Sequence, residues 1–415
     1  MQETTKRKAD GDSAWEGSVF AQSVHLTREF VKVNSENPNH PEIEMQRCLE
    51  AHLRDMNFEF RSFPYKPGRN NVLAFYPSLA YIQENNLPCI MFSGHQDTVI
   101  GYEETGAKSA QIKDGRIYGR GACDMKGGIA SFFTAINSFI ADQGIGENKK
   151  KLKRGILISL TVDEEMGCAG IKALKDNPLL KGELKIDFCI IGEPSGLAPV
   201  IGHKGIVWFT LEFSGKAAHG SVPEQGDNAV EKAVEFISRL KGLKESLSSR
   251  SIPDMPEVTP PTLNVGVIKG GEKANIVPDR CIIKLDRRLI PTENTEIAKT
   301  EILKVVKACC LEDCCKIKHS NSGESYLIPE GTENPVFKQL MKIVGKYGVP
   351  ACPFMEGYTE ADVYHRYFGI PAINLGPGSI EQAHVSDEFV EIKQLLKASQ
   401  IYYNILEHYV LGEEE

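Results

Sequence analysis

The chain has 415 residues, of which 41% are hydrophobic and 25% are charged, and its formal net charge is −8. A chain of this length exceeds one ordinary hydrophobic core, so we expect a globular protein with two domains. The negative charge gives no electrostatic reason to expect nucleic acid or an anionic membrane surface as a partner.

Eleven cysteines are spread along the chain without the spacing of a disulfide scaffold, and the first residues are polar. Both features are typical of a cytoplasmic protein. No apolar stretch approaches the roughly 18 residues that a membrane span needs. Residues 1–16 mix charged residues and glycine without an apolar period, which predicts a flexible tail.

The first two predicted helices cover residues 18–33 and 41–56, and an apolar strand is predicted at residues 88–92. His95 and Asp97 follow this strand. Because they are two residues apart on an extended chain, they share a face, and the carboxylate could orient an imidazole that binds a metal. The alternative is a turn whose histidine is satisfied by its neighbours.

A glycine-rich segment, residues 113–128, opens a helix predicted at residues 125–142. It does not match the phosphate-binding pattern G-x-x-x-x-G-K-[ST]. Asp124 lies at the start of the helix, where a carboxylate can cap the first turn. A carboxylate held beyond the end of a sheet could equally bridge two cations.

An apolar run at residues 154–162 predicts a strand buried on both faces, and it ends in Asp163, Glu164 and Glu165. Neighbouring carboxylates repel one another and lose hydration, so we expect a cation beside them. Glu164 and Glu165 point to different sides of an extended chain, so one could bind a metal while the other binds or deprotonates a water. A solvated acidic loop is the alternative.

Two further candidate ligands follow apolar strands in the same way. Glu193 comes after a strand predicted at residues 186–191, and His384 lies in the glycine-rich loop after residues 372–375. Together the candidate ligands are His95, Asp124, Glu165, Glu193 and His384. This set of imidazoles and carboxylates suits two divalent ions, Zn²⁺ with Co²⁺ or Mn²⁺ as alternatives.

From residue 204 the pattern changes to strand, helix, strand, strand, helix, which predicts a small α+β sandwich at residues 204–319, inserted into the larger domain. His219 lies in a loop of this insert, where an isolated histidine is usually a surface residue. Arg288 with Asn275 could clamp a substrate carboxylate, because arginine offers paired donors, and a surface ion pair is the alternative. The cysteines at residues 309–315 lack the two-unit spacing of a structural zinc site, which favours packing.

These motifs in combination resemble the M20 metallopeptidase family of acetylornithine deacetylases, succinyl-diaminopimelate desuccinylases, aminoacylases and glutamate carboxypeptidases. The likeness covers residues 18–410 and rests on residues 93–99, 119–128, 163–165 and 191–194 and on His384. Within the family the chain looks most like the acetylornithine deacetylases, on residues 192–195, 203–205, 261–266, 359–361 and 375–384.

The resemblance implies an α/β fold with two domains. A zinc-peptidase-like catalytic domain, with a mixed central sheet flanked by helices, would comprise residues 17–203 and 320–415. Residues 204–319 would form an inserted ferredoxin-like lid and dimerisation domain. Two chains would therefore associate as a homodimer through the insert.

The resemblance also implies a role for each candidate residue. The metal ligands would be His95 and Glu193 for one ion, Glu165 and His384 for the other, and Asp124 as the bridge. Glu164 would be the general base, and Asp97 would orient the first histidine. His219 would stabilise the oxyanion in the partner subunit's active site. The substrate contacts would be Asn275, Arg288, Gly357, Thr359 and Glu360. The resemblance further implies a cis peptide bond between Asp124 and Met125.

The implied activity is hydrolysis of an N-acyl amino acid, first of all N2-acetylornithine, in arginine biosynthesis. Succinyl-diaminopimelate, other N-acyl amino acids and dipeptides are the alternatives within the same chemistry. A metal-binding scaffold without turnover is an alternative of a different class. The expected partners are a small-molecule substrate and a second copy of the chain, with no nucleic acid and no membrane.

Overall fold

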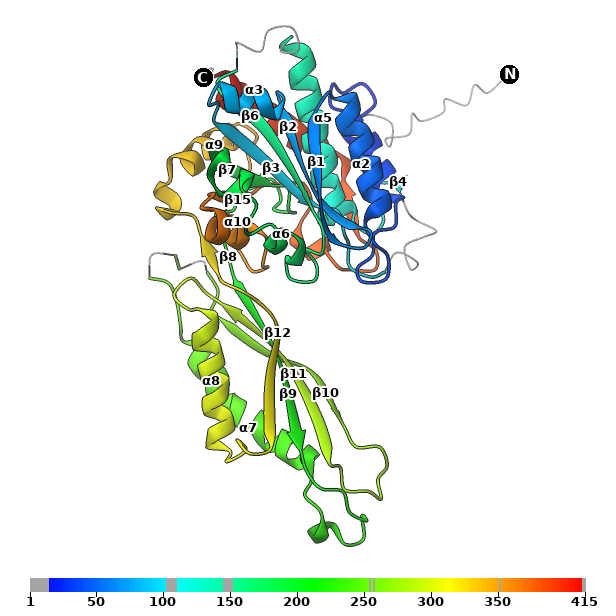
Figure 1. Ribbon diagram of the computed structural model, residues 1–415, viewed down its shortest axis with the longest axis vertical. Helices are drawn as coiled ribbons and strands as arrows, with labels where there is room; N and C mark the ends of the chain where they lie inside the picture. The colour runs from blue at the N-terminus through cyan, green and yellow to red at the C-terminus, as the bar shows by residue number, and fades with distance from the viewer. Residues whose placement is uncertain are drawn as a thin grey trace, which may run out of the picture. The chain divides into compact units, whose positions relative to one another are not determined.

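The computed structural model describes residues 15–101, 110–144, 152–253, 255–256, 258–350 and 352–412. The chain divides into two compact units (Figure 1). The first lies within Met1–Ile201, Ile328–Pro353 and Thr359–Glu415, and the second lies within Gly202–Leu327 and Phe354–Tyr358. The second unit therefore contains the residues of the predicted insert, and it also includes the chain as far as Leu327 and a short later segment.

A six-stranded sheet in the order β1-β2-β6-β3-β7-β15 forms the centre of the first unit. Its strands are β1 (Glu59–Lys66), β2 (Arg69–Tyr76), β3 (Cys89–His95), β6 (Gly155–Thr161), β7 (Ile186–Ile191) and β15 (Ala372–Asn374). β3 pairs in parallel with β6 and β7, and β7 with β15, whereas β2 pairs antiparallel with β1 and β6. The predicted α/β class with a mixed central sheet is confirmed.

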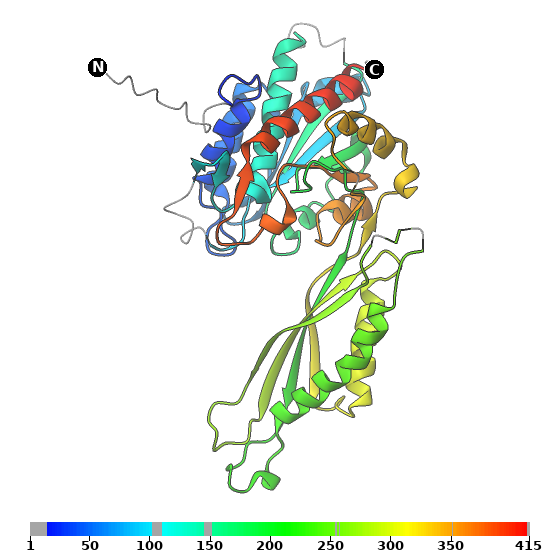
Figure 2. The same ribbon diagram turned by 180° about the vertical axis from the view of Figure 1, so that it is seen from behind.

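Helices cover both faces of this sheet (Figures 1 and 2). The α-helices of the first unit are α1 (Gln22–Val31), α2 (Ile43–Asp55), α3 (Leu79–Glu84), α5 (Gly127–Asp142), α6 (Ala169–Ala173), α9 (Pro335–Gly345), α10 (Ala361–Phe368) and α11 (Ile392–Leu406). On one face, Phe92 of β3 packs against Phe132 of α5 and Tyr402 of α11. The next residue, Ser93, points to the other face, where its hydroxyl lies 2.8 Å from that of Tyr364 in α10. Across the described residues, no helix has the length and apolar character needed to cross a membrane.

A smaller sheet and an apolar cluster lie next to the start of the described chain. The sheet consists of β4 (Gln111–Lys113), β5 (Arg116–Tyr118) and β16 (Phe389–Glu391). Residues 1–14 of the predicted tail lie outside the described residues. Trp15, which the same prediction assigned to the tail, is buried with Val24, Ile117 and Leu395. The packed part of the chain therefore includes Trp15, ahead of the first predicted helix.

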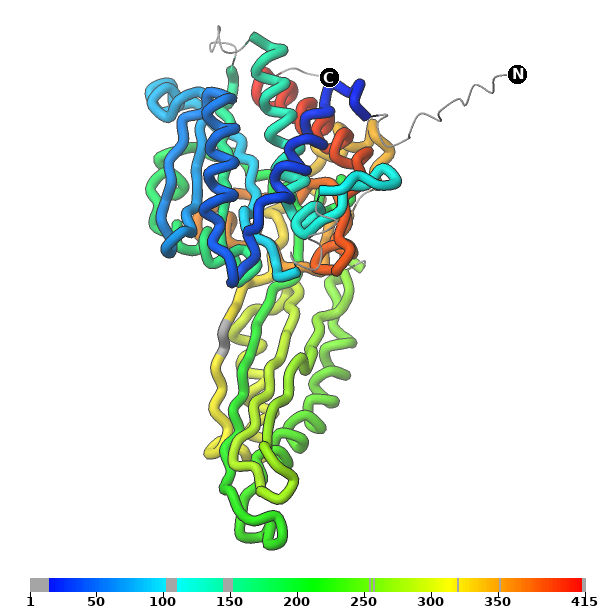
Figure 3. Tube along the Cα trace, turned by 90° about the vertical axis from the view of Figure 1, so that its right-hand side faces the viewer, coloured from blue at the N-terminus to red at the C-terminus, as the bar shows by residue number. Residues whose placement is uncertain are grey.

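The second unit has the element order strand, helix, strand, strand, helix, strand. Its elements are β9 (Gly205–Ser214), α7 (Ala229–Ser248), β10 (Thr262–Gly270), β11 (Arg280–Leu289), α8 (Thr295–Ala308) and β12 (Cys315–Gly323). The sheet is antiparallel in the order β10-β11-β9-β12, which with this connectivity is a ferredoxin-like arrangement. Both helices share one core with alternate residues of β9 and β11, so they cover the same face (Figure 3). A short sheet of β13 (Tyr326–Leu327), β8 (Gly202–His203) and β14 (Phe354–Met355) joins the later segment to this unit.

Two glycines bring α5 into backbone contact with the end of β7. A Cβ atom at Gly128 would lie 2.1 Å from the carbonyl oxygen of Gly192, far inside van der Waals contact. Asp124 precedes α5, and Glu193 directly follows Gly192. The contact between the two backbones therefore determines how closely these acidic residues can approach one another.

We expect Gly128→Ala to lower the melting temperature, because the added methyl group must push α5 away from β7. Overpacking of this kind destabilises by about 1–3 kcal/mol. The matched control is Gly242→Ala in α7, where an added Cβ has no atom within 4 Å. At this position in α7, alanine should raise the free energy of unfolding by about 0.5–1 kcal/mol. Calorimetric melting measures both effects, and a Gly128→Ala protein as stable as the wild type would contradict the packing argument.

Candidate active site

The predicted ligands lie at the carboxyl edge of the central sheet, where open α/β sheets bind their ligands. Three neighbouring strands supply most of them. His95 ends β3, Glu164 and Glu165 follow β6, and Glu193 follows β7. The parallel pairing of these strands therefore gathers residues that are far apart in the sequence.

Asp124 lies at the centre of the group, in the turn before α5. Its Oδ1 atom is 3.0 Å from Nε2 of His95, and its Oδ2 atom is 3.4 Å from Nε2 of His384. Nε2 of His95 is also 3.9 Å from Oε1 of Glu193. Nε2 of His384 is 3.2 Å from Oε1 of Glu165. Each histidine is thus paired with one glutamate, and Asp124 directs one oxygen toward each pair.

The turn that carries Asp124 differs from an ordinary helix start. The N-cap residue of α5 is Lys126, and no side-chain hydrogen bond caps the helix. The peptide bond between Asp124 and Met125 is cis, as the resemblance implied. The carboxylate of Asp124 therefore faces the two histidines and does not cap the helix.

The two imidazoles are surrounded by negative charge. Burial alone would lower the pKa of His95, but its hydrogen bond with Asp124 and the nearby carboxylate charges raise that pKa well above the usual value. Hydrogen bonds with Asp124 and Glu165 raise the pKa of His384 to about 11. Burial would raise the pKa of Asp124, yet the two imidazoles lower it. The carboxylates thus favour positive charge at both histidines.

For Glu164, Glu165 and Glu193, the nearby positive charge does not offset the effect of burial. Burial, followed by the charge of Asp124, raises the pKa values of Glu165 and Glu193. Burial also raises the pKa of Glu164, against the opposing charge of His95. Ligand atoms of His95, Asp124 and Glu165 lie within 4.8 Å of one another. Because carboxylates outnumber imidazoles here, and the donors are nitrogen and oxygen, the residues fit divalent ions such as Zn²⁺, Co²⁺ and Mn²⁺.

The three consecutive acidic residues after β6 have different environments. Asp163 is neutralised within the chain, because Nζ of Lys66 lies 2.6 Å and Nη1 of Arg69 lies 3.1 Å from its carboxylate. Glu164 is buried, and its Oε1 atom accepts a hydrogen bond from Sγ of Cys168 at 3.1 Å. The uncompensated charge therefore belongs to the two glutamates and not to the aspartate.

Asp97 supports the site through its backbone and its carboxylate in different ways. Nδ1 of His95 lies 2.9 Å from the backbone oxygen of Asp97 and 3.7 Å from its Oδ1 atom. The carboxylate accepts hydrogen bonds from the backbone N–H groups of Glu164 and Glu165, at 3.1 and 3.2 Å. It also accepts one from Asn37 at 3.0 Å. The backbone of Asp97 therefore orients the histidine, and its side chain fixes the turn that carries both glutamates.

Glu388 also supports the site, and sequence reasoning missed it. Its Oε1 atom accepts hydrogen bonds from the backbone N–H groups of Cys123 and Asp124, at 2.9 and 3.1 Å. Its Oε2 atom accepts one from Nη1 of Arg120 at 2.6 Å. Because a glutamate in a loop is usually solvated, its residue type gave no signal. The position four residues after His384 was the one available clue.

Two of the predicted substrate contacts, Thr359 and Glu360, belong to the first unit and are buried. Oγ1 of Thr359 accepts a hydrogen bond from the backbone N–H of Ala361 at 3.2 Å, at the start of α10. Oε2 of Glu360 accepts one from Oγ of Ser93 at 3.2 Å, and burial raises the pKa of Glu360 to about 7. Both side chains therefore have partners within the fold.

The other predicted substrate contacts, Asn275, Arg288 and Gly357, belong to the second unit, as does His219, the predicted oxyanion stabiliser. His219 and Asn275 are exposed on adjoining segments, since the backbone N–H of Gly220 donates to the backbone oxygen of Asn275 at 2.8 Å. Arg288 donates two hydrogen bonds to Asp286 of the same strand, at 2.9 and 3.1 Å. In this structure Arg288 thus forms the ion pair that was the alternative to a substrate clamp.

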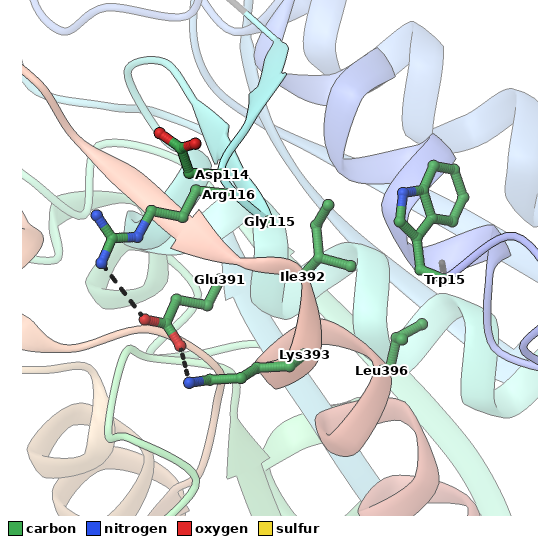
Figure 4. A pocket seen from close by; sticks show the side chains of 8 residues that line it. All are labelled: Trp15, Asp114, Gly115, Arg116, Glu391, Ile392, Lys393 and Leu396. Atoms are coloured by element: carbon green, nitrogen blue, oxygen red, sulfur yellow. Dashed lines mark ion pairs between the residues drawn. The ribbon is translucent and has the colours of Figure 1, made fainter. Parts of the chain in front are cut away.

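A separate pocket of about 380 Å³ lies in the first unit. Figure 4 shows its lining residues, which are Trp15, Asp114, Gly115, Arg116, Glu391, Ile392, Lys393 and Leu396. Three of its charged groups form ion pairs, since Glu391 lies 3.7 Å from Arg116 and 2.8 Å from Lys393. Among these described lining residues none is a predicted site residue, so we do not assign catalysis to this pocket.

The chain is similar to known proteins of one family. Residues 91–408 match the profile of a family described as "Peptidase family M20/M25/M40". The acetylornithine deacetylase of Proteus mirabilis (strain HI4320) is 30% identical over 365 residues, covering 86% of this chain and 87% of that protein. That of Erwinia tasmaniensis is 31% identical over 369 residues, covering 87% and 89%. The crystal structure of the M20 family metallo-carboxypeptidase Sso-CP2 from Sulfolobus solfataricus matches with a TM-score of 0.76 and 21% identity, covering 94% of this chain and 99% of that one.

We expect Glu388→Ala to weaken the binding of Zn²⁺, because it frees the backbone that carries Asp124. Removing a residue that supports a metal ligand typically lowers metal affinity about 10–100-fold. The control is Glu381→Ala, an exposed glutamate of the same loop. Competition with a chromophoric chelator measures both affinities, and an unchanged affinity in Glu388→Ala would rule out the supporting role.

Proposed function

Because this chain belongs to peptidase family M20/M25/M40 and is a metal-dependent amidohydrolase of that family, we propose that it removes the acetyl group from N2-acetylornithine, yielding ornithine and acetate. The observation that carries the proposal is the position of Asp124 between two histidine–glutamate pairs, with the buried Glu164 beside them. Curated relatives with 30% and 31% identity that are named acetylornithine deacetylase support the choice of substrate.

The metal ligands in this proposal follow the two pairs. His95 and Glu193 would hold one ion, Glu165 and His384 the second, and Asp124 would bridge them. We assign Zn²⁺ to both positions, with Co²⁺ and Mn²⁺ as alternatives. When bound, the ions would polarise the amide carbonyl and make a nearby water molecule more acidic.

Glu164 would act as the general base and then as the general acid. It removes a proton from the water molecule whose oxygen attacks the carbonyl carbon of the acyl group. The tetrahedral intermediate then collapses, the C–N bond breaks, and Glu164 returns the proton to the departing amine nitrogen. Asp97 keeps this base in position, because its carboxylate binds the backbone N–H groups of Glu164 and Glu165.

The second unit would serve as a lid and as the interface of a homodimer. His219 would reach the active site of the partner subunit and stabilise the oxyanion. The exposure of His219 and of the adjoining Asn275 supports this role. The substrate contacts in the proposal are Asn275, Arg288, Gly357, Thr359 and Glu360.

We further propose that the protein acts in the cytoplasm, in arginine biosynthesis. All eleven cysteines are free thiols, which is typical of a reducing compartment. Succinyl-diaminopimelate, other N-acyl amino acids and dipeptides are the alternative substrates.

A deacylation screen tests the substrate. The protein, loaded with Zn²⁺ or Co²⁺, is assayed on N2-acetylornithine, succinyl-diaminopimelate, N-acetylmethionine and a dipeptide. We expect the highest kcat/KM on N2-acetylornithine. A higher value on one of the other compounds would replace the proposed substrate with that compound and leave the hydrolytic chemistry in place.

Replacing the general base tests the mechanism. Glu164→Gln should lower kcat about 10²–10⁴-fold, because the amide cannot accept the proton of the attacking water. The metal content should stay unchanged, since Glu164 is not among the proposed ligands. Elemental analysis and steady-state kinetics measure the two quantities, with Glu381→Gln as an exposed control. Wild-type turnover in Glu164→Gln would remove this mechanism.

A further inference from the structure

A second group of metal-binding side chains lies on helices α1 and α2 of the first unit. It consists of Glu29 from α1 and of Cys48 and His52 from α2. One ligand atom of each residue lies within 4.8 Å of the other two. None of the three takes part in the proposed hydrolysis.

The helical geometry explains why the three side chains converge. Cys48 and His52 are four residues apart, so they lie on the same face of α2, one turn from each other. Oε1 of Glu29 lies 3.3 Å from Sγ of Cys48 and 3.1 Å from Nε2 of His52. The imidazole is also in edge contact with the ring of Phe30, with centroids 5.6 Å apart. Side chains from two helices therefore converge on one point.

The donor set suits one class of ion. A thiolate, an imidazole and a carboxylate are the three ligand types that Zn²⁺ combines in proteins. Tetrahedral ligands at bond lengths of about 2.0–2.3 Å are separated by roughly 3.3–3.8 Å. The observed separations of 3.1 and 3.3 Å are close to that range, so small side-chain movements would complete the site. The sulfur ligand disfavours Mg²⁺ and Ca²⁺, which prefer oxygen.

Solvent can reach the three side chains, and a fourth ligand position is open to water. The side chain of Glu29 is 50% exposed and that of His52 is 23% exposed, so water can fill a fourth position. A cavity of about 220 Å³ opens beside His52, and Asp55 is another of its lining residues. A cation can therefore reach the three ligands from solvent.

We propose that Glu29, Cys48 and His52 bind one Zn²⁺ ion, with water as the fourth ligand. The ion links α1 to α2 on the outside of the first unit. This site is separate from the proposed catalytic ions, and the inference does not depend on the substrate or on turnover.

Cobalt spectroscopy of the full-length protein tests the proposal. A Co²⁺–thiolate bond gives a charge-transfer absorption in the near ultraviolet, whereas the proposed catalytic ligands are all nitrogen and oxygen. We expect this absorption in the Co²⁺-loaded wild type. Cys48→Ser should lose the absorption and bind one equivalent of Co²⁺ fewer than the wild type. His52→Gln should weaken the binding of that same equivalent.

The control is Cys352→Ser, which removes an exposed cysteine elsewhere in the first unit and should keep both the absorption and the equivalent. The test compares the Co²⁺ content and the absorption of each variant with those of the wild type. The comparison is therefore valid for any number of ions at the active site. Equal metal content and equal absorption in the wild type, Cys48→Ser and His52→Gln would overturn the proposal. The His52→Gln variant keeps the test decisive if Cys48→Ser does not fold.

Discussion

The structure depends on a surplus of buried negative charge at one edge of the central sheet. Asp124, Glu164, Glu165 and Glu193 surround two imidazoles, and burial raises the pKa values of the three glutamates. Such a cluster is stable only with further positive charge, because a buried carboxylate without a partner is costly. Lys66 and Arg69 neutralise the neighbouring Asp163, whereas within the described residues no lysine or arginine forms an ion pair with the three glutamates. The negative charge that remains on these glutamates is what suits the site to divalent cations.

Much of the fold could be predicted from the sequence, because the central strands bury both faces and therefore carry apolar runs. The predicted bounds of β7, residues 186–191, agree with those of the structure. β1 (Glu59–Lys66) was missed, and it is an edge strand of its sheet. Edge strands need fewer apolar residues and tolerate proline, such as Pro64 in β1, so their sequences resemble loops.

Some residues of the candidate site can be recognised from the sequence, whereas the contacts of others are visible only in the folded structure. Histidines and acidic residues directly after apolar strands could be singled out because the same pattern recurs after several strands of the chain. Glu388 could not, since only the folded loop shows that its carboxylate binds the backbone at Asp124. For Asp97, sequence reasoning identified the residue but not its contacts, because a spacing of two residues cannot distinguish a carboxylate from a backbone oxygen.

One short loop carries both His384 and Glu388. The imidazole of His384 lies next to the carboxylate of Asp124, and the carboxylate of Glu388 accepts a hydrogen bond from the backbone N–H of the same aspartate. A displacement of this loop would therefore move a candidate ligand and the backbone support of Asp124 together. One insertion or substitution that shifts the loop would accordingly disturb Asp124 at its carboxylate and at its main chain at once.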